Sequence, residues 1–170
     1  MSKRKKIFFI FIFILFSFSN VYSSEKVAFV NIDYLIKNSN LGKIALKNIS
    51  EADKKNLNVL KKRNESLKEL ELEIKKKQNI ISEEAFKNEV NELKNKVNEF
   101  SKEKDLLVKE FNTFKKKELN KVFEKISPII REYMSDNSIT ILMDTKNIFM
   151  GDVNADITKQ LLKKIDEIKN

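Results

Sequence analysis

Apolar residues recur at helical spacing through most of the chain, from Leu41 to Asp136. This stretch has no glycine after Gly42 and no proline before Pro128, so little interrupts a helix. The second half is the more regular one, because its apolar residues are separated by steps of four and three, with Lys104 in the one missing position. These residues are Phe86, Val90, Leu93, Val97, Phe100, Leu107, Phe111 and Phe114. The pattern predicts a long helix with a narrow coiled-coil seam.

The first half of the stretch carries the same period more weakly. Its seam positions, seven residues apart, are Leu60, Leu67, Ile74 and Ile81, and the polar residues that interrupt them are Asp53, Asn56, Arg63 and Lys77. A lysine run near residue 77 suits a helix C-terminus, and Ser82 followed by two glutamates suits a helix start. We therefore expect an antiparallel helical hairpin over residues 41–136 with its tip at about 78–82. The interrupted seam suggests the hypothesis that the first helix is the more flexible one.

Residues outside the hairpin follow a different period. Residues 26–33 (KVAFVNID) and 139–144 (ITILMD) are rich in apolar and β-branched residues, and a third short run occupies 148–150 after a turn. These runs predict three strands. A last amphipathic helix is expected after Asp156, with an apolar face made of Leu161, Leu162, Ile165 and Ile168. The predicted fold class is α+β, mostly α: a small β body from residues 24–40 and 137–170, with the hairpin inserted between its strands.

A body of this size buries too little surface to be stable alone, and an open three-stranded sheet leaves two unpaired edges. Neither a disulfide nor a Cys/His metal site can compensate, because the chain has no cysteine and no histidine. The sequence therefore predicts self-association through the strands. The candidate oligomerisation residues are Val27, Phe29, Val30, Ile32, Ile139, Ile141, Met143 and Ile148.

The N-terminus has the pattern of a secretory signal peptide. A basic segment from Lys3 to Lys6 precedes an almost unbroken apolar run from Ile7 to Phe18. Cleavage between Ser23 and Ser24 is expected, so residues 1–23 would be removed and the mature protein exported to the periplasm. The alternative is an uncleaved membrane anchor, although the apolar run is short for a membrane span.

Composition excludes several kinds of chemistry. Without cysteine or histidine the chain has no thiol nucleophile, imidazole base or Cys/His zinc site. Gly42-Lys43 is not a phosphate-binding loop, because the upstream glycine is missing and Ile44 replaces the Ser/Thr ligand. The sequence gives no support for an enzyme or a cofactor. The net charge is +9, and removal of Lys3, Arg4, Lys5 and Lys6 with the signal peptide leaves 9 − 4 = +5, a weak preference for acidic partners. An export signal and the lack of aromatic residues between the basic ones argue against nucleic acid.

Basic clusters on the hairpin are candidate contact sites, although a solvated helix face is the simpler explanation of any single cluster. The cluster near residue 76 is of most interest, because it lies at the tip beside apolar residues. The candidate partner-contacting residues are Lys61, Lys62, Arg63, Lys75, Lys76, Lys77, Ile80, Ile81 and Phe86.

The order of these features resembles the Skp/OmpH family of periplasmic chaperones. The shared features are a signal peptide, KVAFVNID, a polar break before Gly42-Lys43, a charged hairpin, ITILMD, and Asp156-Ile157-Thr158 before an amphipathic helix. The resemblance implies a homotrimer with a barrel-like β body, whose three hairpins enclose a cavity. It also implies ATP-independent holding of unfolded outer-membrane β-barrel proteins on their way to insertion. Assistance by anionic lipid or lipopolysaccharide stays open, as do two other roles: a structural coiled-coil envelope protein and a membrane-tethered adaptor without clients.

Overall fold

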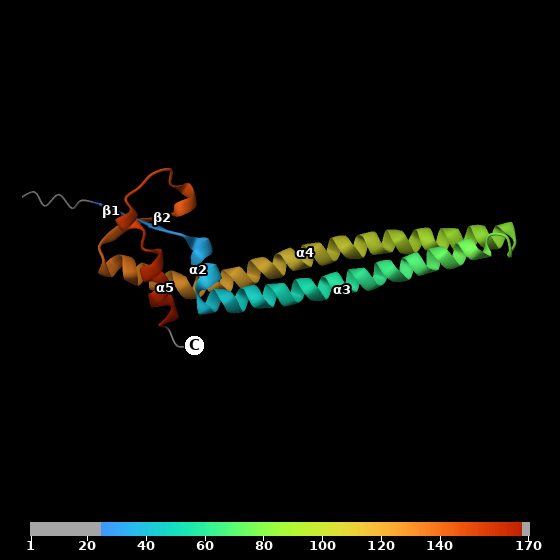
Figure 1. Ribbon diagram of the computed structural model, residues 1–170, viewed down its shortest axis with the longest axis horizontal. Coiled ribbons are helices and arrows are strands. Elements are labelled where there is room, and N and C mark those ends of the chain that lie inside the picture. The colour runs from blue at the N-terminus through green and yellow to red at the C-terminus, as the bar shows by residue number, and fades with distance from the viewer. Residues whose placement is uncertain (1–24, 168–170) are drawn as a thin grey trace, which may run out of the picture.

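Two long antiparallel helices project from a small α/β body in the computed structural model, which describes residues 25–167 (Figure 1). Helix α3 spans Asn40–Lys77 and helix α4 spans Glu83–Asp136. At about 1.5 Å per residue, their 38 and 54 residues give lengths of about 57 and 81 Å. The predicted hairpin is confirmed. The predicted signal peptide, with the cleavage site between Ser23 and Ser24, lies outside the described residues.

Serine side chains start both helices of the hairpin. The Ser39 hydroxyl accepts a hydrogen bond from the Gly42 amide at 3.1 Å, and the Ser82 hydroxyl accepts one from the Ala85 amide at 3.3 Å. These bonds satisfy amides that have no partner inside the helix. The two caps fix where each helix begins, and the sequence predicted the one at Ser82.

The sheet of the body contains two parallel strands, β1 (Lys26–Val30) and β2 (Ile139–Asp144). Val27 pairs with Ile141, and Phe29 pairs with Met143. Parallel neighbours need a long crossover connection, and here the whole hairpin forms it. The hairpin is therefore an insertion between adjacent strands, as expected.

Two details of the predicted sheet are wrong. The first strand ends at Val30, because the Asn31 side chain accepts the Tyr34 amide and starts helix α2 (Ile32–Asn38). Residues 148–150, including Ile148, form no strand. They belong to a loop between two short 3₁₀ turns, η1 (Thr145–Asn147) and η2 (Val153–Ala155). The edge of β1 that a third strand could use is already contacted by the chain itself, since the Ile157 amide donates to the Phe29 carbonyl at 2.9 Å.

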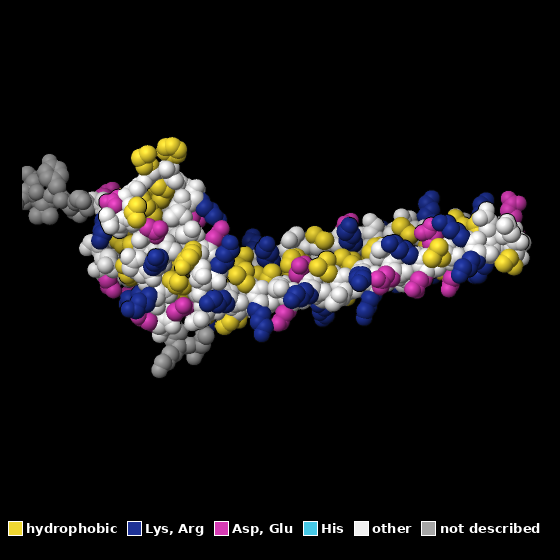
Figure 2. Space-filling model, in the orientation of Figure 1, with side chains coloured by type: hydrophobic (Ala, Val, Ile, Leu, Met, Phe, Trp, Pro, Cys, Tyr) yellow, Lys and Arg dark blue, Asp and Glu magenta, His cyan; other side chains and the backbone are white. Residues whose placement is uncertain are grey.

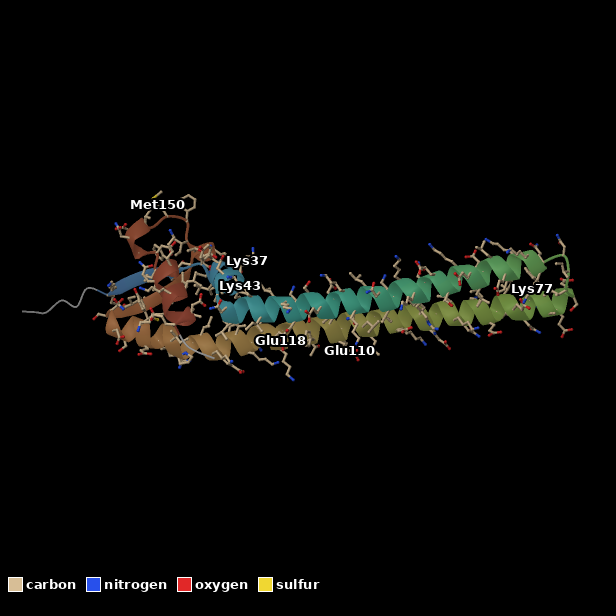
Figure 3. All side chains as sticks on the ribbon, turned by 60° about the horizontal axis from the view of Figure 1, so that its bottom comes forward. Lys37, Lys43, Lys77, Glu110, Glu118 and Met150 are labelled. Atoms are coloured by element: carbon tan, nitrogen blue, oxygen red, sulfur yellow. The ribbon has the colours of Figure 1, made fainter. Side chains whose placement is uncertain are left out.

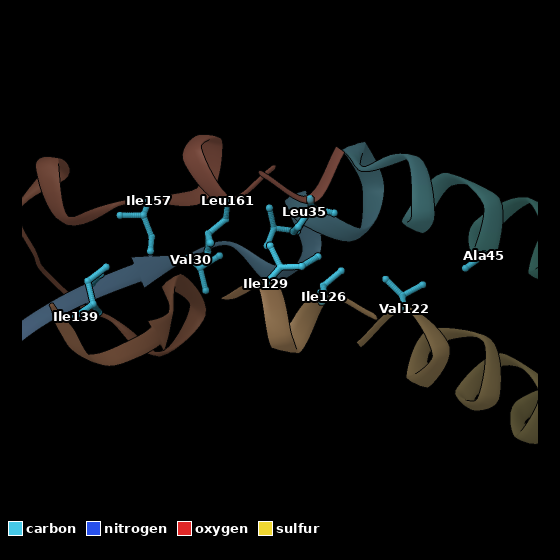
Figure 4. Packing of buried hydrophobic residues seen from close by; sticks show 11 residues of the cluster. Val30, Leu35, Ala45, Val122, Ile126, Ile129, Ile139, Ile157 and Leu161 are labelled. Atoms are coloured by element: carbon cyan, nitrogen blue, oxygen red, sulfur yellow. The ribbon is translucent and has the colours of Figure 1, made fainter. Parts of the chain in front are cut away.

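The hydrophobic core lies where the sheet, α2, the C-terminal half of α4 and helix α5 (Thr158–Asp166) meet (Figure 4). Leu161 of α5 and Leu35 of α2 are 0% and 1% exposed. The remaining buried members are Ala28, Val30, Ala45, Val122, Ile126, Ile129, Ile139, Ile157 and Ile165. Helix α4 thus belongs to both parts of the molecule. We call residues 40–118 the arm, and the other described residues the body.

The predicted apolar face of α5 is confirmed for Leu161, Leu162 and Ile165, which are buried or packed against the core; Ile168 lies outside the described residues. No helix among residues 25–167 is both long enough and apolar enough to span a membrane.

Candidate functional site

The contact between α3 and α4 is narrow and only partly closed. Ile74 is the one residue of the distal arm that is fully buried, at 4% exposure. The other residues that fill the contact are half-buried: Leu60, Leu67, Leu70, Ile81, Phe86, Leu93, Phe100, Leu107, Phe111 and Phe114. Two predicted seam residues, Val90 and Val97, remain 40% and 46% exposed. The observed seam is therefore rotated relative to the predicted one, so that one of its edges is open to solvent.

Ion pairs between the helices occupy the other edge of the seam. The Arg63 Nε lies 3.6 Å from a Glu103 oxygen, and the Lys77 Nζ lies 3.0 Å from a Glu89 oxygen. Both basic residues interrupt the seam in the sequence, and the structure gives each an acidic partner on α4. Partly exposed pairs of this kind contribute little stability, but they fix the register of the two helices.

The candidate contact residues are spread along the arm and do not form one site. Lys61, Lys62 and Arg63 lie near the middle of α3, whereas Lys75, Lys76 and Lys77 form its last turn. Ile80 at the tip is 79% exposed, and its neighbours Ile81 and Phe86 are half-buried in the hairpin contact. Figure 2 shows apolar side chains reaching the surface along the whole arm, among basic and acidic ones. The geometry offers an extended surface with many small apolar positions.

Glu118 marks the junction between arm and body, as Figure 3 shows. It is 5% exposed, accepts a hydrogen bond from the Asn48 amide group at 2.9 Å, and forms an ion pair with Lys121. The hydrogen bond from Asn48 and the nearby Lys121 lower the pKa of this carboxyl. Sequence reasoning missed this residue. A signal was present, because Glu118 lies four residues after Phe114 and four before Val122 on an otherwise apolar stripe.

The predicted oligomerisation residues have two different environments. Val30 and Ile139 are buried in the core of their own chain, and Phe29, Ile32 and Ile148 are half-buried. Val27, Ile141 and Met143 are 39%, 43% and 39% exposed. Only the last three are clearly available to a second chain.

The loop after β2 carries exposed apolar residues that the sequence did not predict as contact residues. Phe149, Met150 and Val153 are 101%, 84% and 85% exposed, and they form an apolar projection on the body. Figure 3 labels Met150 in this loop, and Figure 2 shows apolar side chains projecting from the body. Gly151 lies against the ring of Phe29, because a Cβ atom there would approach a ring carbon to 2.2 Å. This contact holds the loop over the sheet and turns its apolar side chains outward.

The aspartates of the body have structural roles. Asp144, Asp152 and Asp156 accept backbone amides of the turns that follow them, at 3.1, 2.9 and 2.9 Å. Asp33 forms an ion pair with Lys146 at 2.7 Å, and this contact lowers the pKa of Asp33 and raises that of Lys146. Among residues 25–167, no group of three acidic, histidine or cysteine side chains is placed to bind a metal ion.

The sequence model of the outer membrane protein (OmpH-like) family matches residues 26–165, which is nearly all of the described chain. The protein belongs to the OmpH-like family. Its fold is also similar to the crystal structure of an OmpH-like protein from Caulobacter crescentus CB15, for which an outer membrane chaperone role has been suggested. That similarity has a TM-score of 0.73 at 18% sequence identity and covers 84% of each chain. No match was found among curated protein sequences.

Membership of the OmpH-like family confirms the resemblance drawn from the sequence and supports a chaperone role. The similarity to the Caulobacter crescentus protein extends this agreement to the arrangement of hairpin and body.

Proposed function

We propose that this OmpH-like protein is an ATP-independent holdase of the periplasm, which binds unfolded outer-membrane β-barrel proteins between its arms and delivers them for insertion. The observation that carries the proposal is the arm itself. It extends far from the body, and apolar side chains such as Leu57, Val90 and Val97 remain 57%, 40% and 46% exposed.

Weak, distributed contacts suit a holdase. Each exposed apolar residue of the arm can bury only a small area against a client, so no single contact binds tightly. Many such contacts made together give avidity, and the client can still leave segment by segment when it inserts. A surface of this kind needs no specific pocket and no nucleotide.

Assembly into a homotrimer is part of the proposal. Within residues 25–167 the outer edge of β2 has no strand partner. Ile141 and Met143 of β2 expose apolar surface, and so does the projection Phe149–Met150. An exposed parallel edge with apolar residues is unstable unless another chain covers it. Strand pairing around a threefold axis would cover these edges and point three arms to the same side.

Export to the periplasm rests on the predicted signal peptide over residues 1–23 and on the family. The mass of the N-terminus of the mature protein tests cleavage after Ser23 and separates a free protein from a tethered one.

Light scattering tests the holding activity directly. An unfolded outer-membrane β-barrel protein is diluted from urea into buffer without nucleotide, with and without the mature OmpH-like protein. We expect scattering to be suppressed once the chaperone is at least stoichiometric. Equal scattering in both samples would exclude a holdase and leave a structural role for the hairpin.

A further inference from the structure

The two long faces of the arm differ. The edge with the pairs Arg63–Glu103 and Lys77–Glu89 defines what we call the ion-paired face. On α4, Val90 and Val97 each follow by one position a residue of that edge, Glu89 or Lys96, and one position on a helix is a rotation of about 100°. They therefore point away from the ion pairs.

The matching residues of α3 lie on the same side. On α3, Arg63 and Leu70 mark the ion-paired edge, because they are seven positions apart. Leu67 and Ile74 each lie four positions later, which rotates them about 40° away from that edge. Because the helices are antiparallel and face each other, rotations of the same sign take both helices from the ion-paired edge to the opposite edge. That edge, the open face, combines Val90 and Val97 of α4 with the half-buried apolar residues of α3.

Lysines border the open face on both helices. On α3, lysines recur every seven residues, and each of them directly follows a position of the heptad seam. On α4, lysines lie one turn before Val90 and Val97, and Lys104 takes the next position of the valine column. The bordering residues are Lys54, Lys61, Lys68, Lys75, Lys87, Lys94, Lys104 and Lys115.

Acidic residues are nearly absent from this side. Two acids lie on the open face of the distal arm: Glu71, which is already paired with Lys75 at 2.8 Å, and Glu83 in the first turn of α4, seven positions before Val90. The other acids of α4 in the distal arm lie on the ion-paired side or the back: Glu84, Glu89, Glu92, Glu99, Glu103, Asp105 and Glu110. Within the described residues, six of the eight bordering lysines form no ion pair; only Lys61 and Lys75 do.

We propose that the open face is the client-binding face of the arm, and that it takes extended polypeptide segments in which apolar residues alternate with acidic ones. The inference rests on the proposed holdase function and names the surface that performs it. The apolar strip receives the apolar side chains, and the bordering lysines attract the acidic ones and orient the segment.

Other occupants fit the open face less well. A second copy of the same face would bring two sets of lysines together, which is unfavourable. A membrane surface favours large, fully exposed apolar residues above a basic helix face. Here the valines are only 40% and 46% exposed and lie between longer lysines, so a single peptide strand reaches them more easily than a flat bilayer.

Matched double variants test the apolar strip. Val90→Gln with Val97→Gln removes it, and Val59→Gln with Leu106→Gln is the control on the ion-paired side, where the side chains are similarly exposed at 41% and 56%. Glutamine is a good helix former, so both variants should keep the helical circular dichroism. We expect the affinity for an unfolded, fluorescently labelled β-barrel protein to fall about tenfold for the open-face variant and less than about twofold for the control.

A second pair tests the charges at constant net charge. Lys94→Glu with Lys104→Glu acts on the open face, and Lys102→Glu with Lys109→Glu acts on the opposite side of α4. We expect only the first to weaken binding and to reduce its dependence on salt.

The outcomes separate the two proposals. If the unmodified protein binds no client, the holdase function fails. If it binds but the two faces lose affinity equally, the holdase stands and the face assignment is wrong. If the open-face variants lose binding to anionic lipid vesicles while client affinity is unchanged, the open face is a membrane surface and the proposal is overturned.

Discussion

Gly42 is the residue that most restricts how the arm leaves the body. A Cβ atom at this position would approach the carbonyl oxygen of Ile36 to 1.9 Å, so the start of α3 can pack on α2 only without a side chain. Gly151 meets only the ring of Phe29, which can move. A side chain at position 42 would therefore meet rigid backbone, whereas one at position 151 would meet a movable side chain.

We predict that Gly42→Ala lowers the free energy of unfolding by about 2–3 kcal/mol, because backbone atoms must shift to make room. Gly151→Ala should cost about 1 kcal/mol or less. Urea unfolding of both variants measures the difference. Equal losses would mean that the contact between α2 and α3 is looser than described.

Glu118 should make the stability of the junction depend on pH. Since its pKa is lowered in the folded protein, its carboxylate stabilises the fold above the ordinary glutamate pKa of about 4.3, and this contribution is lost as the pH falls through the lowered value. We predict that Glu118→Gln lowers the melting temperature at pH 7 and that its difference from the unmodified protein disappears as the pH falls below the lowered pKa of Glu118. Glu124→Gln, on the exposed side of the same helix, is the control. A difference that persists in acid would assign the effect to packing.

At the scale of elements, the helices were predictable and one edge of the sheet was not. Seam periodicity and the caps Ser39 and Ser82 are local properties, so the sequence located the hairpin and its tip. A strand also needs a partner. The apolar run 148–150 has the composition of a strand, but the carbonyl of Phe29 on β1 is bonded to Ile157, a contact between distant residues that composition does not reveal.

The rotation of the seam was equally hidden from the sequence. A period of three and four fits both Val90 and its neighbour Glu89 as contact residues. The choice depends on Lys77, twelve positions away, which bonds to Glu89 across the tip. Only the register of the two helices decides which edge is ion-paired and which is open.

Different parts of the hairpin should open at different rates. Val122, Ile126 and Ile129 of α4 are 4%, 2% and 7% exposed in the body, whereas the distal arm has a half-open contact. We predict that amides of α4 in the body exchange with deuterium most slowly, those near the tip fastest, and those of α3 faster than the α4 amides opposite them, because α3 has the interrupted seam. Uniform protection along both helices would contradict the flexible first helix.

At the scale of the whole molecule, the proposed trimer requires the body to supply the contacts that unite three arms. We predict that Phe149→Ser with Met150→Ser shifts the native mass from trimer towards monomer without loss of helical signal, because it removes the apolar projection that another chain would cover. Ile80→Ser with Leu72→Ser removes exposed apolar surface from the arm instead and should leave the mass unchanged. A stable trimer in the first variant would place the interface elsewhere.

The central claim is that several arms, whose exposed apolar side chains are not buried by their own chain, jointly bind one unfolded protein. Native mass spectrometry of the mature protein mixed with an unfolded outer-membrane β-barrel protein, without nucleotide, tests it most directly. The account predicts a complex of one client with one trimer, and no complex of a client with a single subunit. Trimers that remain free of client at every mixing ratio would contradict it.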